Sequence, residues 1–104
     1  MLHPAMNNTK WNEVRLEMYS LKPAPKWSTL STSGYQYGPD REWYYHFRHG
    51  GYECILHLDI IVDDVTQREQ VRSALKKVHV PGEETREGFR VFGYLQDGQV
   101  ANFL

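Results

Sequence analysis

The chain has 104 residues, which is enough for one domain with one core and too few for two. Its content of 40% hydrophobic residues is typical of a globular chain, and its net charge of −1 argues against non-specific nucleic-acid binding or attraction to an anionic membrane. A single cysteine excludes an internal disulfide, and no apolar run approaches the ~20 residues that span a bilayer. The N-terminus also lacks the pattern of a signal peptide, so we expect a cytoplasmic protein.

Residues 1–7 carry no structural signal, and we expect a flexible extension ahead of a single domain over residues 8–104. A helix is predicted over residues 10–21, with Thr9 as its N-cap and Pro23 as its end. Its apolar side chains recur at helical spacing: Trp11, Val14 and Met18.

Three strands follow. Residues 27–33, rich in Ser and Thr, predict a short edge strand, and residues 34–40, which contain Tyr35 and Tyr37, predict a turn. Residues 42–48 and 52–62 predict a hairpin joined through Gly50 and Gly51. The hydrophobic pattern fixes the register of this hairpin. One face would carry the core side chains Trp43, Tyr45, Phe47, Cys54, Leu56, Leu58, Ile60 and Val62. The other would carry Tyr44, His46, Arg48, Glu53, Ile55, His57 and Asp59.

A second helix is predicted after two aspartates, with Thr66 and Glu69 at the spacing of a capping box. Its apolar stripe is Val71, Ala74, Leu75 and Val78. Residues 82–88 then predict an exposed, mobile polar loop, and residues 89–95 and 100–103 predict a hairpin around an Asp-Gly turn. The predicted order is α-β-β-β-α-β-β: an α+β domain with a mostly antiparallel sheet of four or five strands and two helices.

Catalytic and cofactor signals are weak. His46, His57 and Asp59 share a face and could bind zinc or iron, but they lack the ligand spacing of a known metal motif. Cys54 could be a nucleophile, although its place among apolar residues favours a buried thiol. The glycines form no phosphate loop, and the aromatic hairpin lacks the basic surroundings of a base-stacking platform. We therefore predict no cofactor and no nucleic-acid partner.

Surface recognition is the alternative to catalysis. Tyrosine and arginine are favoured at protein interfaces, because they bring large contact area together with hydrogen-bond donors. The predicted binding residues on the hairpin are Tyr44, His46, Arg48 and His57. A second predicted surface is the acidic stretch that contains Glu83, Glu84 and Glu87.

A resemblance to known proteins also favours a binding role. The chain contains Lys10-Trp11-Asn12-Glu13, the pair Lys26-Trp27 and the run from Glu42 to Tyr52. With these segments it resembles a small uncharacterised bacterial family in which a Trp-containing helix precedes a Trp/Tyr-rich hairpin. In size and class it is similar to immunity proteins, which bind and neutralise a toxin domain. The resemblance implies no catalytic residues.

The resulting expectation is a non-enzymatic bacterial protein that binds another protein, with a toxin-neutralising immunity protein as the specific form. The alternative is a metal-binding domain or a metal-assisted enzyme that uses His46, His57 and Asp59. The identity of the protein partner and self-association into a homo-oligomer are left open by the sequence.

Overall fold

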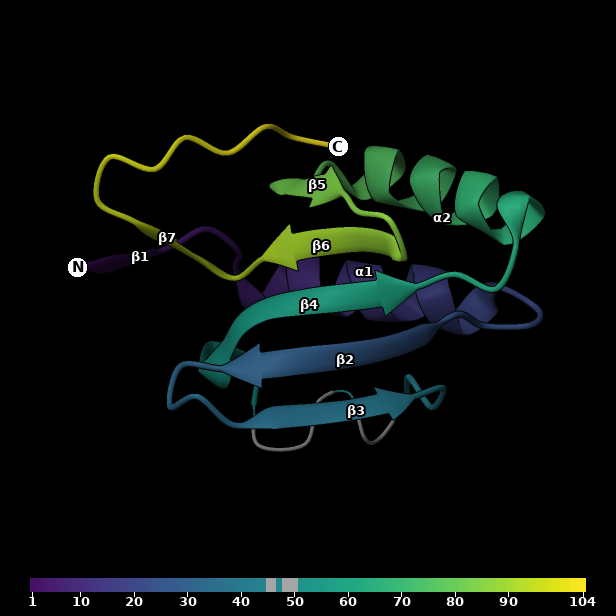
Figure 1. The fold of residues 1–104 in the computed structure, drawn as a ribbon, viewed down its shortest axis with the longest axis horizontal. Helices are drawn as coiled ribbons and strands as arrows, with labels where there is room; N and C mark the ends of the chain where they lie inside the picture. The colour runs from purple at the N-terminus through teal and green to yellow at the C-terminus, as the bar shows by residue number, and fades with distance from the viewer. Residues whose placement is uncertain (45–46, 48–50) are drawn as a thin grey trace.

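The computed structural model describes residues 1–44, 47 and 51–104 (Figure 1). Its main sheet has five antiparallel strands in the order β3-β2-β4-β6-β5, and β1 and β7 pair in a second, two-stranded sheet. Three strands lie between the helices and further strands follow the second, so the α+β class and the order α-β-β-β-α-β-β are confirmed. The elements are β1 (Leu2–Pro4), α1 (Asn8–Ser20), β2 (Lys26–Ser31), β3 (Gln36–Asp40), the 3₁₀ turn η2 (Tyr52–Cys54), β4 (Ile55–Ile61), α2 (Val65–Val78), β5 (Gly82–Glu84), β6 (Gly88–Phe92) and β7 (Tyr94–Gln96).

Each helix begins where a side chain caps its first turn. The Oδ1 atom of Asn7 accepts a hydrogen bond from the backbone N–H of Lys10 at 2.8 Å, and Asp64 accepts one from that of Gln67 at 2.7 Å. The sequence predicted Thr9 as the N-cap of the first helix, but the observed N-cap is Asn7, two residues earlier. The predicted apolar stripes are buried: Trp11, Val14 and Met18 on α1, and Val71, Ala74, Leu75 and Val78 on α2. Neither these helices nor any other in the described residues is long and apolar enough to cross a membrane.

The aromatic segment before η2 does not pair with β4. The predicted hairpin of residues 42–48 with residues 52–62 is wrong, because β4 pairs with β2 on one side and with β6 on the other. Trp43 and Phe47 still reach the core, with exposures of 1% and 3%. Their four-residue spacing suits one side of a helical turn as well as alternate positions in a strand, so the aromatic pattern does not distinguish the two. Residues 45, 46 and 48–50 lie outside the part that the structure describes.

A bulge at the start of β4 changes which side chains face the core. The pairing with β2 passes directly from Ile55 to His57, so Leu56 is an extra residue without a partner on β2. This extra residue places Ile55 on the core side together with Leu58. The predicted core positions of Leu56 and Cys54 are therefore wrong: Leu56 is half-buried, and Cys54 is exposed.

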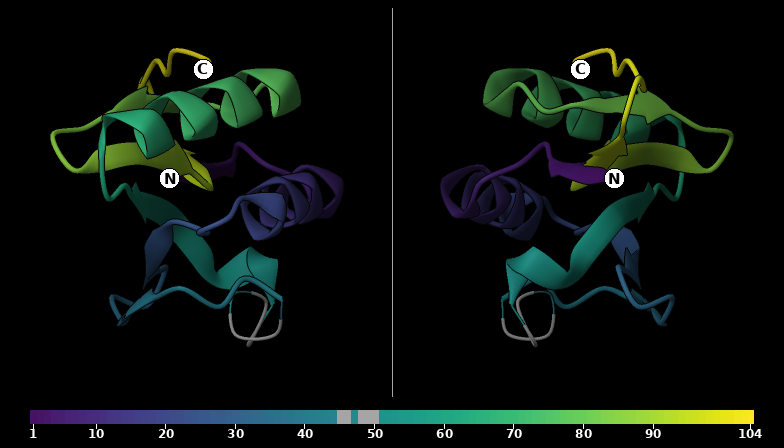
Figure 2. Two further views of the ribbon diagram at one scale, coloured as in Figure 1. Left: turned by 90° about the vertical axis from the view of Figure 1, so that its right-hand side faces the viewer. Right: turned by 90° about the vertical axis from the view of Figure 1, so that its left-hand side faces the viewer.

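Both helices pack on the same face of the main sheet and share one core with it. Figure 2 shows α1 beside the sheet and α2 over its β5–β6 end. Trp27 of β2 lies near the centre of the aromatic part of this core, with ring centroids 6.0 Å from Trp43 and 5.4 Å from Phe47. The strand that carries Trp27 was predicted at an edge, but it lies between β3 and β4. The edge on this side is β3, which contains Pro39.

The two ends of the chain are part of the fold. Residues 1–7, expected as a flexible extension, include β1, which pairs with β7. Asp97 accepts a hydrogen bond from the Met1 amine at 3.2 Å and also contacts His3. Residues 82–88 are not the expected free loop, since residues 82–84 form β5 and pair with β6. Instead of the predicted last hairpin, Phe103 forms a single bridge with Pro81.

Candidate functional site

A hollow of about 350 Å³ opens at the β2–β3 end of the sheet, on the face that carries the core. We call it the aromatic groove. Core side chains form its floor, and hydroxyl groups, a thiol and exposed rings stand around them. Its lining residues are Trp27, Thr29, Ser31, Ser33, Tyr35, Tyr37, Phe47, Gly51, Cys54 and Ile55.

Ring packing holds the floor of the aromatic groove in place. The rings of Trp27 and Tyr37 are stacked, with centroids 5.3 Å apart and planes 14° from parallel. Phe47 meets the edge of Trp27 at 5.4 Å and 76°. The indole N–H of Trp27 donates to the carbonyl of Glu42 at 2.9 Å, which satisfies its polar atom and fixes the ring. These contacts hold the rings of the floor in defined positions.

A tight turn after β2 presents Tyr35 at the rim. The N–H of Ser31 donates to the carbonyl of Tyr35 at 2.8 Å, and the N–H of Tyr35 donates to the Ser31 hydroxyl at 3.0 Å. Gly34 closes this turn with φ of 90°, a left-handed conformation that glycine adopts without steric cost. Tyr35 is 67% exposed, so its ring is available for contact beside a hollow that is largely apolar.

The lining residues offer mostly neutral side chains. None of the described lining residues carries a carboxylate, an imidazole or an ammonium group. The polar groups of their side chains are the hydroxyls of Thr29, Ser31, Ser33, Tyr35 and Tyr37, the indole N–H of Trp27 and the exposed thiol of Cys54. A volume of about 350 Å³ is at the small end of ligand pockets and suits one or two apolar side chains.

The predicted site residues His57 and Asp59 lie on the opposite face of β4 from the core. His57 Nδ1 is 3.9 Å from Asp59 Oδ1 and has no hydrogen-bond partner. Both carboxylate oxygens of Asp59 instead accept hydrogen bonds from Arg90, at 2.8 and 3.1 Å. Burial, together with the Arg90 charge, lowers the pKa of His57 below 6.5. A metal at this position would have to displace the guanidinium from Asp59.

His46, the third residue of the metal hypothesis, lies outside the described residues. Among the residues that the structure does describe, no three His, Cys, Asp or Glu side chains form a group that could hold a metal ion.

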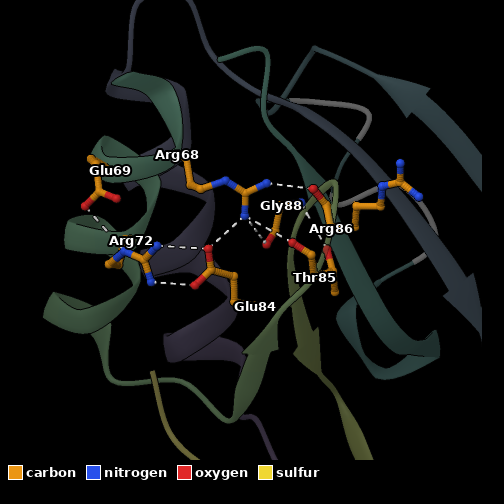
Figure 3. A network of polar contacts seen from close by, with 7 residues as sticks. All are labelled: Arg68, Glu69, Arg72, Glu84, Thr85, Arg86 and Gly88. Atoms are coloured by element: carbon orange, nitrogen blue, oxygen red, sulfur yellow. Dashed lines mark hydrogen bonds and ion pairs between the residues drawn. The ribbon is translucent and has the colours of Figure 1, made fainter. Parts of the chain in front are cut away.

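One glutamate of the acidic stretch on β5 and its turn, Glu84, is bonded to two arginines of α2 (Figure 3). Glu84 accepts two hydrogen bonds from Arg72, at 2.7 and 2.9 Å, and one from Arg68 at 2.9 Å. These bonds, those from Arg72 above all, lower the pKa of Glu84. All three predicted glutamates are exposed. Glu84 differs from Glu83 and Glu87 in that these arginine bonds already engage its carboxylate.

Tyr44 is on the helix side of the molecule, where it contacts α1. Its ring centroid is 5.4 Å from that of Tyr19, and the Arg15 guanidinium lies 5.0 Å from the ring. His57 faces away from the helices, so the structure does not bring Tyr44 and His57 together on one surface. Arg48, like His46, is outside the described part of the chain.

The aromatic groove was not predicted from the sequence. Trp27 was expected in an edge strand, and the segment with Tyr35 and Tyr37 was expected to be a turn. A signal was present: two tyrosines at alternate positions between glycines indicate a short strand with aromatic side chains on one face. Because the 42–48 segment was assigned as the partner of β4, no neighbour was left for this strand.

Comparison with curated proteins and with solved structures finds no match. A family model does match, and it covers nearly the whole chain, from residue 1 to residue 98. The match includes both helices and all seven strands, so it spans the aromatic groove and the main sheet. The chain therefore belongs to DUF6678, a family of unknown function.

Proposed function

We propose that this protein is a non-enzymatic binding module for another protein, and that the aromatic groove receives an apolar side chain of that partner. The observation that carries the proposal is the position of Tyr35, which is 67% exposed at the rim of an apolar hollow. Exposed tyrosine beside a rigid concavity is typical of interface positions where truncation weakens binding most.

The chemistry of the groove limits what the partner can present. An aliphatic or aromatic side chain fits the floor of Trp27, Phe47 and Ile55, while the hydroxyls of Thr29, Ser31 and Ser33 can bond to the backbone around it. A charged side chain would be desolvated there without a counter-charge from the described lining residues. The partner is therefore expected to insert an uncharged residue.

A toxin-neutralising role in a bacterial host is the specific form of this proposal. It is supported by the small α+β domain and by a groove suited to protein contact rather than chemistry. In that role, the groove would cover a surface of the toxin, and no reaction would take place in it. The alternative metal-dependent role has less support, because Arg90 already occupies both oxygens of Asp59.

Site-specific photo-crosslinking tests the binding proposal. A photoreactive amino acid at Ser33, on the rim of the groove, should crosslink one protein in lysate of the native host, and mass spectrometry identifies it. The purified partner should then bind the Tyr35→Ala variant about 30-fold more weakly than the wild type, as for an interface residue worth about 2 kcal/mol.

Tyr19→Ala is the matched control, because Tyr19 is 54% exposed on α1 and does not line the groove. It should bind like the wild type. Equal affinities for the wild type and both variants would contradict a role for the groove. For the toxin-neutralising form, co-expression with the partner should relieve its toxicity, and Tyr35→Ala should not.

A further inference from the structure

The C-terminal tail, residues 102–104, lies beside the outer edge of the main sheet and joins it through one antiparallel bridge (Figure 1, beside β5). The N–H of Gly82 donates to the carbonyl of Asn102 at 2.9 Å, and the N–H of Leu104 donates to the carbonyl of Val80 at 2.9 Å. Between these bonds, Pro81 and Phe103 form an antiparallel bridge. The tail thus satisfies backbone groups that the edge would otherwise expose.

Two side chains of the tail occupy defined positions at this edge. The ring of Phe103 stacks on the imidazole of His79, with centroids 4.7 Å apart and planes 19° from parallel. Leu104 packs against the core, and its Cδ1 lies so close to Gly82 that a Cβ there would be 3.1 Å away. The edge therefore provides a flat support for an aromatic ring and a small recess for an aliphatic side chain.

The tail is held by few contacts. Phe103 remains 55% exposed, and Val100, in the segment that leads to it, is 90% exposed. Segments with few buried apolar contacts open locally at low free-energy cost. The family match ends at residue 98, so it includes the edge at residues 80–82 and excludes the tail that covers it.

We propose that the edge formed by residues 80–82 is a second binding site, which takes an extended peptide segment of another protein with an aromatic residue followed by an aliphatic one. The tail occupies this site within the same chain and competes with the partner. Addition of a strand to a sheet edge gives affinity through backbone bonds and selectivity through alternate side chains. This site lies at the opposite edge of the sheet from the aromatic groove and does not depend on it.

Peptide binding to full-length variants tests the proposal. The probe is a fluorescent peptide with the sequence of residues 98–104, and its control has Ala at the positions of Phe103 and Leu104. The double variant Phe103→Ala, Leu104→Ala keeps the whole chain but loosens the tail. It should bind the probe at least about tenfold more tightly than the wild type, because a tethered tail competes at an effective concentration in the millimolar range.

Val100→Ala is the matched tail variant, since Val100 is 90% exposed, and it should bind the probe like the wild type. Chemical shifts of the Val80 and Gly82 amides in the double variant should follow the titration. Equal binding by wild type and double variant, or equal binding of the probe and the Ala peptide, would overturn the proposal.

Amide exchange of the wild type provides a test that needs no variant. If the tail opens, the amides of Gly82 and Leu104 should exchange at similar rates and much faster than the amides that join β4 to β6. Exchange of Gly82 and Leu104 as slow as in β4 and β6 would show that the tail does not release the edge, and it would equally overturn the proposal.

Discussion

Arg68 fastens the turn of the β5–β6 hairpin to α2, and its replacement by Met separates the effect of the guanidinium from that of the aliphatic stem. The guanidinium donates to the carbonyls of Arg86 at 2.7 Å, Thr85 at 3.1 Å and Gly88 at 3.4 Å, besides the Glu84 carboxylate (Figure 3). The side chain is only 22% exposed. Hydrogen bonds to a charged group of this kind contribute about 1.5–3 kcal/mol, so Arg68→Met should reduce the free energy of unfolding by about 2 kcal/mol.

Thermal unfolding and amide exchange measure the effect of this change. A loss of about 2 kcal/mol corresponds to a fall of roughly 8–16 °C in melting temperature for a small domain. Arg72→Met is the matched control, because the hydrogen bonds and ion pairs of Arg72 within the described part of the chain go to the carboxylates of Glu84 and Glu69 and not to the turn. Exchange at residues 85–88 should accelerate in Arg68→Met far more than in Arg72→Met. An unchanged melting temperature together with unchanged exchange in the turn would refute this reasoning.

Three further predictions concern β4 and the residues beside it. Leu58→Ala should reduce the free energy of unfolding by about 2–5 kcal/mol, whereas Leu56→Ala should cost clearly less, since Leu58 is fully buried and Leu56 is half-buried; urea unfolding measures both. The pKa of His57 is lowered by folding, so the unfolded chain binds this proton more readily. Stability should therefore fall as pH drops below 6.5, and urea midpoints across pH 5–8 should show a smaller fall in His57→Gln. Cys54 should react completely with a thiol reagent in the native state, and slow, unfolding-limited reaction would contradict its exposed position.

The helices and their buried faces could be predicted because their signals are local. Trp11, Val14 and Met18 repeat at helical spacing within one segment, and so do Val71, Leu75 and Val78. The number of strands between the helices was also predicted, but one of the three was placed at residues 42–48 instead of at β3. None of these inferences required knowledge of which segments are neighbours in space.

Strand pairing depends on segments that are distant in the sequence, and the local pattern predicted the wrong partner for β4. A glycine pair between two apolar segments favours a hairpin, but β4 pairs with β2 along one edge and with β6 along the other, and both partners are distant from it in the sequence. The bulge at Leu56 arises from the same pairing, so the burial of Ile55 and the exposure of Cys54 could not be read from alternation alone. The aromatic groove was missed for this reason, since it exists only where β3 lies beside β2.

The two outer strands of the main sheet differ in how they resist joining the strands of other molecules. At β3, Pro39 has no backbone N–H to offer, and this protection is covalent and permanent. At the start of β5, the N–H of Gly82 and the carbonyl of Val80 are satisfied by the tail of the same chain, and this protection lasts only while the tail stays in place. The risk of fibril-like growth is therefore concentrated at one side of the molecule, where heat or a loosened tail would expose it.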